Sequence, residues 1–486
     1  MPAAATSLWI IVAIVALGTA IGVLAGRRQV MDLEQWTVGS RRFGAALMYL
    51  LLAGEMYTTF SFLGASGWAY SRGGPSLYIL AYIALGNVVS FFILPGIWEM
   101  GRRHGMQTQP DFFKVRYGNK YLSGLVCLVG IAAVVPYLQL QIAGLGIIVN
   151  VASFGGIGRA PAMVVSVGLL VVFVWASGIR AVAWISVLKD LLMLVAALAI
   201  GIAIPHIYFG GIGPMFAALA HARPLHLTMP GATASLDHTW YVSTVLLSAL
   251  GYSMWPHYFA SAFTARSADV IRRNAVVLPL YALTLPFVLF AGFAAILVVP
   301  GLANGDLALL TMVRRSFPPW FLGLVGGAGA LTAMVPAAVL ILTAATLFAK
   351  NIFRPMFAPT MSDAGVARLA RIMVVVIGLA SLGLALHSSM SLVSLLLIGY
   401  AGVAQLFPGV VLGLFWERVT TLGVFCGLVA GVAAAVFLLT THRDPVFGMN
   451  AGFVALCVNF AIVVAISRAR PAAAADAAHP APQIVA

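Results

Sequence analysis

Long apolar stretches separated by short polar connections run through the whole chain of 486 residues. A transmembrane helix needs about 20 mostly apolar residues, and stretches of that kind predict about thirteen spans. They lie at residues 7–26, 44–70, 76–98, 121–153, 161–178, 181–208, 239–264, 274–300, 320–349, 368–387, 391–415, 419–440 and 449–467. The apolar runs are continuous and do not alternate with period two, so they indicate helices and not a transmembrane β-barrel. The pattern predicts an all-α integral membrane protein.

Composition and charge agree with a membrane protein. Only 8% of the residues are charged, whereas a soluble domain carries about 25%. The net charge of +14 does not indicate nucleic-acid binding, because the basic residues lie in the connections between spans. Most of the 27 lysines and arginines fall on one side of the predicted topology, the exceptions being Arg72, Arg159, Arg223, Arg314, Arg315 and Arg443. Positive charge marks the cytoplasmic side, so we expect a multi-pass protein of the cell (inner) membrane with its N-terminus outside and its C-terminus in the cytoplasm.

The spans carry no sequence signature of catalysis. They contain no paired carboxylates, metal-ligand cluster or nucleophile–base set. Cys127, Cys426 and Cys457 lie in apolar runs without CxxC spacing, so they predict neither a metal site nor a disulfide. We therefore expect neither enzyme activity nor a cofactor, and we expect membrane lipid and a small-molecule solute as partners.

Two spans, the second and the seventh, are interrupted by glycine and polar residues at corresponding depth. The second contains AGEMYTTFSFLG (53–64), and the seventh contains LSALGYSMWPHYFASAF (247–263). Pro256 removes a backbone donor and obstructs the preceding helical turn. Many secondary transporters consist of two inverted repeats whose discontinuous helices bind the solute. The spacing predicts repeats at 44–208 and 239–415 with a solute site between their first helices; a simple kink at Pro256 is the alternative.

Several motifs resemble those of the sodium:solute symporter family. They are TFSFLGASGWAYSRGGPSLYI, SGIRAVAWISVLKD, RSADVIRRN and TLFAKNIFRP. The stretches GEMYTTFSFLGASGWAY and AMVPAAVL look most like the branch that takes up short monocarboxylates and some amino acids. The resemblance implies a LeuT-type fold of five plus five core helices. It also implies an extra helix and cytoplasmic loop before the core (1–43) and two helices after it (416–468). The Pro/Ala-rich composition of residues 469–486 predicts a disordered cytoplasmic tail.

The resemblance also implies a cation site, at which this chain departs from the family pattern. In the family, sodium is held by carbonyls at the break of the first core helix, which correspond to Gly54 and Tyr57. Two hydroxyl side chains on the eighth core helix complete the site, and they correspond to Val335 and Pro336. Neither residue offers a side-chain oxygen, and a supporting aspartate corresponds to Ser186. The usual sodium site is therefore not expected, and no metal site is predicted.

Lys189 lies one helical turn beyond Ser186 and precedes Asp190. In proton-coupled transporters of this fold class, a lysine amine on this helix can occupy the sodium position, and Lys189 is a candidate for that role. The alternative is a lysine at the inner end of a span, paired with Asp190 and important only for topology. Burial disfavours the charged form of an amine, which would let Lys189 bind and release a proton. The coupling ion is predicted to be H⁺ or Na⁺, with H⁺ favoured.

Glu55 lies deep in the second span, where a carboxylate is costly. Three interpretations remain open. Glu55 is a proton-coupling carboxylate, the ionised partner of a buried cation such as Lys189 or His257, or a protonated packing residue.

The predicted function is a cation-coupled symporter that imports a small organic solute by alternating access. The solute is expected to be a short monocarboxylate (lactate-, pyruvate- or acetate-like) or a small amino acid, and helix N-terminal amides at the breaks are expected to bind its carboxylate. The candidate solute-binding side chains, taken from the broken helices and the third core helix, are Tyr57, Thr58, Ser253, Trp255, His257 and Gln139. A Na⁺-coupled symporter for proline, a sugar or pantothenate is an alternative, and a passive channel is an alternative of another class.

Overall fold

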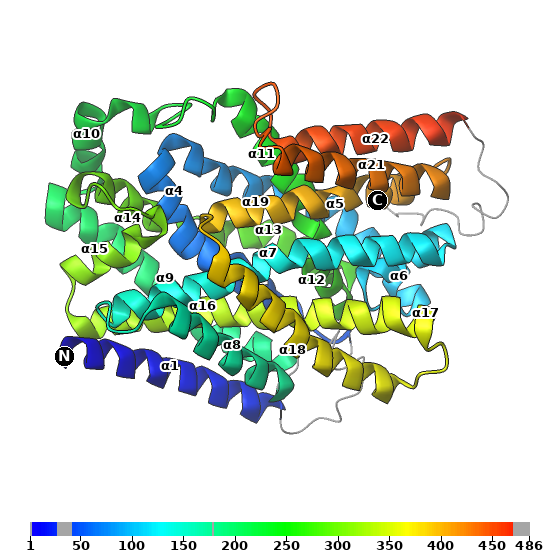
Figure 1. The fold of residues 1–486 in the computed structure, drawn as a ribbon, viewed down its shortest axis with the longest axis horizontal. Coiled ribbons are helices and arrows are strands. Elements are labelled where there is room, and N and C mark those ends of the chain that lie inside the picture. Colours follow the sequence, from blue (N-terminus) through cyan, green and yellow to red (C-terminus); the bar gives the residue numbers. More distant parts are fainter. Residues whose placement is uncertain (1, 27–40, 177–178, 470–486) are drawn as a thin grey trace.

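The computed structural model describes residues 2–26, 41–176 and 179–469 (Figure 1). The described residues form helices without any strand. Most of the predicted loop before residue 43, and the predicted tail beyond Ala469, lie outside the described residues.

The first half of the chain begins with a long helix and contains one broken helix. Its elements are α1 (Pro2–Gly26), α3 (Ala45–Met56), η2 (Phe60–Gly64), α4 (Ala65–Arg72), η3 (Gly74–Leu77), α5 (Tyr78–His104), α6 (Gln109–Tyr117), α7 (Lys120–Ala152), α8 (Arg159–Ala176), α9 (Ile179–Phe209), α10 (Ile212–Ala222) and η4 (Pro224–Leu227). The element η2 is a short π-helix.

The second half begins with another broken helix and ends with a helical pair. Its elements are α11 (His238–Gly251), η5 (Tyr252–Met254), α12 (Pro256–Ser261), η6 (Ala262–Thr264), α13 (Ala268–Ala282), α14 (Leu285–Val298), η7 (Gly305–Leu307), α15 (Ala308–Ser316), α16 (Pro319–Thr346), η8 (Leu347–Phe353), α17 (Arg354–Phe357), α18 (Asp363–His387), α19 (Leu392–Val403), η9 (Ala404–Leu406), α20 (Phe407–Phe415), α21 (Thr421–Thr440) and α22 (Ala451–Ala469).

Ten helical segments among the described residues are long and apolar enough to cross a membrane, and the bent pair α3/α4 makes eleven. Two of the predicted spans are not in that set. The span predicted at 161–178 corresponds to α8, which has a shorter apolar stretch, and the span predicted at 239–264 is divided into α11 and α12. The structure therefore does not confirm the count of thirteen.

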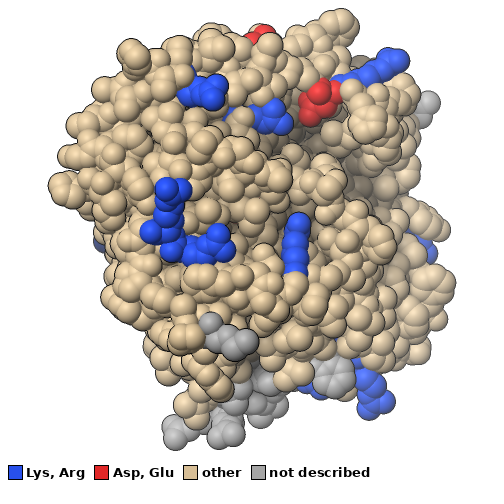
Figure 2. Space-filling model, turned by 60° about the vertical axis from the view of Figure 1, so that its left-hand side comes forward, with Lys and Arg blue, Asp and Glu red and all other residues tan. Residues whose placement is uncertain are grey.

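The helices run roughly parallel to one another, and the beginning of α1 and the end of α22 lie at opposite ends of the bundle (Figure 1). Helix α16 is buried along most of its length. Gly323 and Gly327 let α1 approach it closely, because a Cβ at Gly323 would lie 2.8 Å from the carbonyl oxygen of Ser7. The face shown in Figure 2 is mostly uncharged, with a few basic side chains and fewer acidic ones.

The first broken helix consists of α3 and α4, whose axes differ by 52°. Helix α3 ends because Tyr57 has an extended backbone (φ −89°, ψ 106°). The next turn, η2, begins after Thr59, so the chain at the break leaves carbonyl groups of α3 without their helical partners.

The second broken helix consists of α11 and α12. It breaks at Trp255, whose backbone leaves the helical region (φ −57°, ψ 127°), and α12 begins at Pro256. Proline is favoured at the first position of a helix because it has no N–H to leave unpaired. The two breaks predicted from the sequence are therefore both present, and Pro256 begins a helix and does not merely kink one.

Candidate functional site

The side chain of Lys189, on α9, ends at the break between α3 and α4. Its Nζ donates hydrogen bonds to the carbonyl oxygens of Gly54 (2.6 Å) and Tyr57 (2.9 Å), and the residue is fully buried. These are the two carbonyls that the sequence assigned to a cation. The lysine ammonium lies where those carbonyls converge.

Gly54 makes this contact possible. A Cβ at position 54 would lie 2.5 Å from Oγ of Ser186, so a larger residue would hold α3 away from α9. The Oγ of Ser186 donates to the carbonyl of Val182 in its own helix. Val335 and Pro336 are buried within α16, and neither supplies a side-chain oxygen.

A polar network continues from Lys189 to the second half of the chain. Its Nζ lies 3.0 Å from Oδ1 of the buried Asp190, so the ion pair and the carbonyl contacts exist together. The hydroxyl of Tyr281, on α13, lies 3.4 Å from the same carboxylate oxygen. The hydroxyls of Tyr57 and Thr284 hydrogen-bond to each other. The network therefore joins α3, α9 and α13.

A small central cavity lies between the two broken helices. Its volume is about 30 Å³, enough for about two water molecules. The lining residues come from five helices, counting each broken helix once, and are mostly aromatic: Glu55, Met56, Phe60, Tyr82, Ile83, Tyr137, Tyr252, Trp255, His257, Tyr258, Leu396 and Tyr400. A solute of more than a few heavy atoms requires these side chains to move apart.

Glu55 faces this cavity from the end of α3. Its side chain is 3% exposed, and neither carboxylate oxygen has a hydrogen-bond partner among the described residues. Nε2 of His257 lies 3.9 Å from Oε2 of Glu55, and Nδ1 of His257 also has no partner among the described residues. The structure thus brings Glu55 and His257 together at one cavity.

The backbone amides at the first break are already hydrogen-bonded by side chains. The amide of Thr58 donates to Oγ of Ser61 (3.2 Å), and the amide of Thr59 donates to Oε1 of Gln141 (3.3 Å). The amide of Phe60 donates to Oγ1 of Thr58 (3.2 Å). These are the amides expected to bind a solute carboxylate, and in this structure each has an acceptor from the protein.

Of the remaining predicted solute-binding residues, Trp255 lines the cavity with His257. Ser253 and Gln139 are not among the lining residues. The buried Ser253 accepts a hydrogen bond from Ser90 at 3.3 Å, and Gln139 donates to the carbonyl of Leu384 on α18 at 3.3 Å.

Sequence reasoning missed most of the tyrosines around the cavity. Tyr82 comes from α5, Tyr137 from α7, and Tyr252 and Tyr258 flank the second break. Tyr137 follows Pro136, and Tyr252 and Tyr258 flank Pro256. Aromatic residues close to a proline within a predicted span were the signal that would have pointed to three of them.

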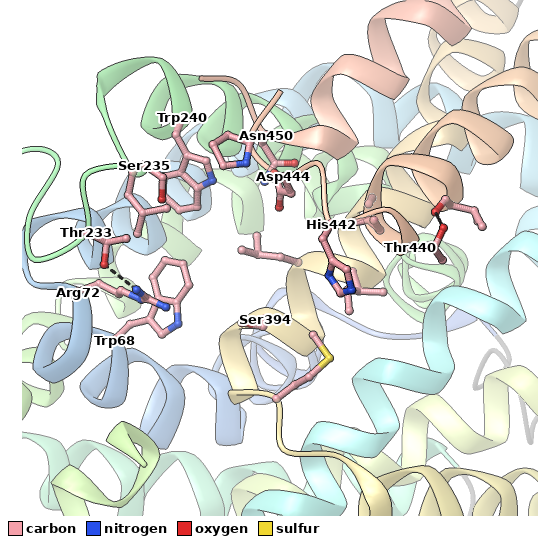
Figure 3. Close-up of a pocket in the computed structure, with 18 residues that line it drawn as sticks. Trp68, Arg72, Thr233, Ser235, Trp240, Ser394, Thr440, His442, Asp444 and Asn450 are labelled. Carbon is pink, nitrogen blue, oxygen red and sulfur yellow. Dashed lines mark hydrogen bonds between the residues drawn. The ribbon is translucent and has the colours of Figure 1, made fainter. Parts of the chain in front are cut away.

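An open vestibule of about 610 Å³ lies beyond the central cavity, at the end of the bundle that the predicted topology places outside. Arg72 lines it and donates to Oγ1 of Thr233 at 2.6 Å (Figure 3). Trp68 and Trp240 also line the vestibule, with ring centroids 5.7 Å apart and ring planes tilted by 32°. Aromatic contacts continue inward from Trp68 through Tyr78 and Tyr82 to the cavity-lining Tyr400. These rings separate the vestibule from the central cavity.

A second small cavity, also about 30 Å³, lies on the opposite side of His257. Beyond it, Asp111 of α6 accepts hydrogen bonds from Lys350 and Asn351 of η8, each at 2.9 Å. Burial by itself would raise the pKa of Asp111, but the Lys350 ammonium and the hydrogen bonds outweigh it, so the pKa is lowered from its usual value. This network ties α6 to the end of α16 and closes the cavity on that side.

Asp306, in η7, holds elements together near the vestibule end. Its Oδ2 accepts from the amide of Leu392 at the start of α19 (3.0 Å), and a Cβ on Gly67 of α4 would lie 2.7 Å from its Oδ1. Burial raises the pKa of Asp306 to about 6, although the Leu392 amide and the charge of Arg159 act in the opposite direction.

Comparison with known proteins identifies the family. The family model described as "Sodium:solute symporter family" matches residues 36–431. The chain belongs to the sodium:solute symporter family. It is 43% identical to an uncharacterized symporter, YhjB, of Bacillus subtilis, over 97% of this chain and 99% of that one. It is 27% identical to a monocarboxylate transport permease protein of Rhizobium johnstonii, over 96% and 98% of the two chains.

Among solved structures, a Na⁺-coupled sialic acid symporter matches with a TM-score of 0.79 at 17% identity, over 99% of both chains. At that identity the likeness concerns the fold alone, and it agrees with the LeuT-type fold expected from the sequence. A member of the sodium:solute symporter family with this fold is a cation-coupled symporter of the membrane.

Proposed function

We propose that this symporter couples solute uptake to protons through Lys189, and that its solute is a short monocarboxylate or a small amino acid. The observation that carries the proposal is the pair of hydrogen bonds from the Lys189 ammonium to the carbonyls of Gly54 and Tyr57. Na⁺ is a hard cation that takes oxygen ligands, and the positions of the family's hydroxyl ligands hold Val335 and Pro336. A protonated amine supplies the positive charge instead.

The coupling follows from what the amine connects. When it is protonated, Lys189 holds the break of α3 against α9 by charge-assisted hydrogen bonds, which are about twice as strong as neutral ones. Loss of the proton weakens both bonds, and the two helices are then free to separate. Proton release therefore accompanies opening of the site toward the side where the proton leaves.

The remaining sequence expectations become part of this proposal. The inverted repeats are residues 44–208 and 239–415, the N-terminus is outside, and the solute passes from the vestibule to the central cavity and leaves past His257. The monocarboxylate class is supported by the similarity to the monocarboxylate transport permease protein of Rhizobium. The amino-acid class is supported by the acidic and aromatic lining of the cavity.

The proposal is tested with purified protein in proteoliposomes that contain no Na⁺. A pH gradient, acidic outside, is imposed, and uptake of radiolabelled L-alanine and L-lactate is measured. We expect at least one solute to accumulate, and a protonophore to abolish the accumulation. Accumulation that requires a Na⁺ gradient and ignores the pH gradient would overturn proton coupling and favour the Na⁺-coupled alternative. Uptake that never exceeds the external concentration under any imposed gradient would indicate a channel.

A further inference from the structure

We propose that the central cavity recognises its solute by a positively charged ammonium group, with the Glu55 carboxylate as its counter-ion and aromatic rings around it. The inference rests on the proposed function, because it takes this cavity as the solute site. Of the two solute classes in that proposal, it selects the small amino acid over the bare monocarboxylate.

The charge of the lining favours a cation. Glu55 is the acidic residue among the described residues that line the cavity, and neither lysine nor arginine is among them. Its two buried oxygens lack donors within the described part of the chain, and a buried carboxylate without hydrogen bonds is costly. An ammonium group supplies both the opposite charge and up to three N–H donors. A carboxylate solute would instead place a second negative charge beside the first.

The aromatic rings favour a cation as well. Trp255 lies between Tyr137 and Tyr400, with ring centroids 4.8 Å and 5.3 Å away. Tyr252 and Tyr258 form another close pair, with centroids 4.8 Å apart. Faces of tryptophan and tyrosine rings attract cations, most strongly where water is excluded, and cages of such rings bind ammonium groups.

The anion-binding amides expected at the first break are occupied. The three backbone amides at the first break, at Thr58, Thr59 and Phe60, already donate to side chains of the protein. His257 remains, with Nδ1 unpaired among the described residues and Nε2 near Glu55. A small amino acid can place its ammonium group at Glu55 and its carboxylate at His257, and it then pairs with both side chains.

The experiment compares three probes of similar size. L-Alanine and L-lactate differ only in an ammonium group replaced by a hydroxyl, and ethylamine has the ammonium group without the carboxylate. Equilibrium binding to the purified full-length protein is measured at pH 7 by displacement of radiolabelled L-alanine. Equilibrium binding needs no imposed gradient, so a variant that cannot accumulate solute can still be measured.

We expect alanine to bind at least about 10-fold more tightly than lactate, as one charge-assisted hydrogen bond implies. Glu55→Gln should weaken alanine binding by about 10- to 100-fold, while Glu417→Gln, at an exposed position, leaves it unchanged. Tyr137→Leu, which removes the ring, should bind alanine more weakly than Tyr137→Phe, which keeps it. Ethylamine binding would show that the ammonium group suffices; ethylamine failing while alanine binds would show that the carboxylate at His257 is also needed.

Lactate binding as tightly as alanine, or alanine binding unchanged in a folded Glu55→Gln protein, would overturn the inference. Folding of each variant is checked by its elution as a monodisperse peak and by its melting temperature. The proposed function fails differently: it fails if uptake of every bound solute requires Na⁺. Proton-driven lactate uptake without alanine binding would therefore refute the ammonium site and leave proton coupling intact.

Discussion

Replacement of Lys189 by methionine removes the charge at the break and keeps most of the side-chain volume. In the wild type, Nζ contacts Gly54 O, Tyr57 O and Asp190 Oδ1 at 2.6, 2.9 and 3.0 Å. The variant leaves the Asp190 carboxylate buried without its cation, and loss of one partner of a buried ion pair costs about 3–5 kcal/mol. We therefore expect a lower melting temperature as well as a transport defect.

The transport defect is measured as an accumulation ratio. At one proton per solute, a gradient of about 1.5 pH units supports up to about 30-fold accumulation, because each unit is worth about 1.4 kcal/mol. Lys189→Met should reduce this ratio to about 1, while exchange of labelled for unlabelled solute, which needs no gradient, continues. Lys114→Met, the same substitution at an exposed position, should accumulate like wild type.

A second variant separates coupling from stability. Lys189→Met with Asp190→Asn removes both charges, so the uncompensated carboxylate is gone and part of the stability should return. Accumulation should not return with it. Wild-type accumulation in either the single or the double variant would refute the role of Lys189 as the coupling group.

Three further predictions concern the ends of the site. Asp111→Asn should lower the free energy of unfolding by about 1.5–3 kcal/mol through loss of the partly buried, charged contact with Lys350. Asp363→Asn, at an exposed ion pair with Arg354, should change it by less than about 1 kcal/mol, and equal melting temperatures of the two variants would contradict this. Burial raises the pKa of Asp306 to about 6 from 3.8, so the protonated form of Asp306 stabilises the fold by up to about 3 kcal/mol. This contribution is fully present below about pH 4 and is lost as the pH rises through about 6. The melting temperature should therefore fall between pH 4 and 7, and Asp306→Asn should remove that dependence. Gly67→Ala should destabilise the protein by about 1–3 kcal/mol, because the added Cβ would lie 2.7 Å from Asp306 Oδ1; an unchanged melting temperature would show that η7 yields without cost.

The sequence predicted the positions of both broken helices, because each break depends on local features. A proline after an apolar run and polar residues inside one are visible in the chain itself. Lys189 and the carbonyls of Gly54 and Tyr57 required the family resemblance, since a buried lysine can serve topology alone and every residue has a carbonyl. The structure adds that the amine reaches both of them.

The lining of the cavity was less predictable, because it is assembled from separate helices. Gln139 and Gln141 are two residues apart on α7, so they point to different sides. In the structure, Gln139 hydrogen-bonds to α18 and Gln141 hydrogen-bonds to Thr59. Their spacing in the sequence does not tell which of the two faces the cavity. Tyr82 lies in a long apolar helix and looks like a packing residue until α11 and α19 lie beside it.

The adjacency of Lys189 and Asp190 has an electrical consequence if Lys189 carries the proton. With the amine protonated, the pair has no net charge, so it adds nothing to the charge that the loaded carrier moves across the membrane field. After proton release the Asp190 carboxylate remains, and the pair adds one negative charge to the empty carrier on its return. A membrane potential that is negative inside drives such a charge outward, with about 2.3 kcal/mol per 100 mV for a full crossing. Through this pair, voltage would then act on the return of the empty carrier and not on the entry of solute.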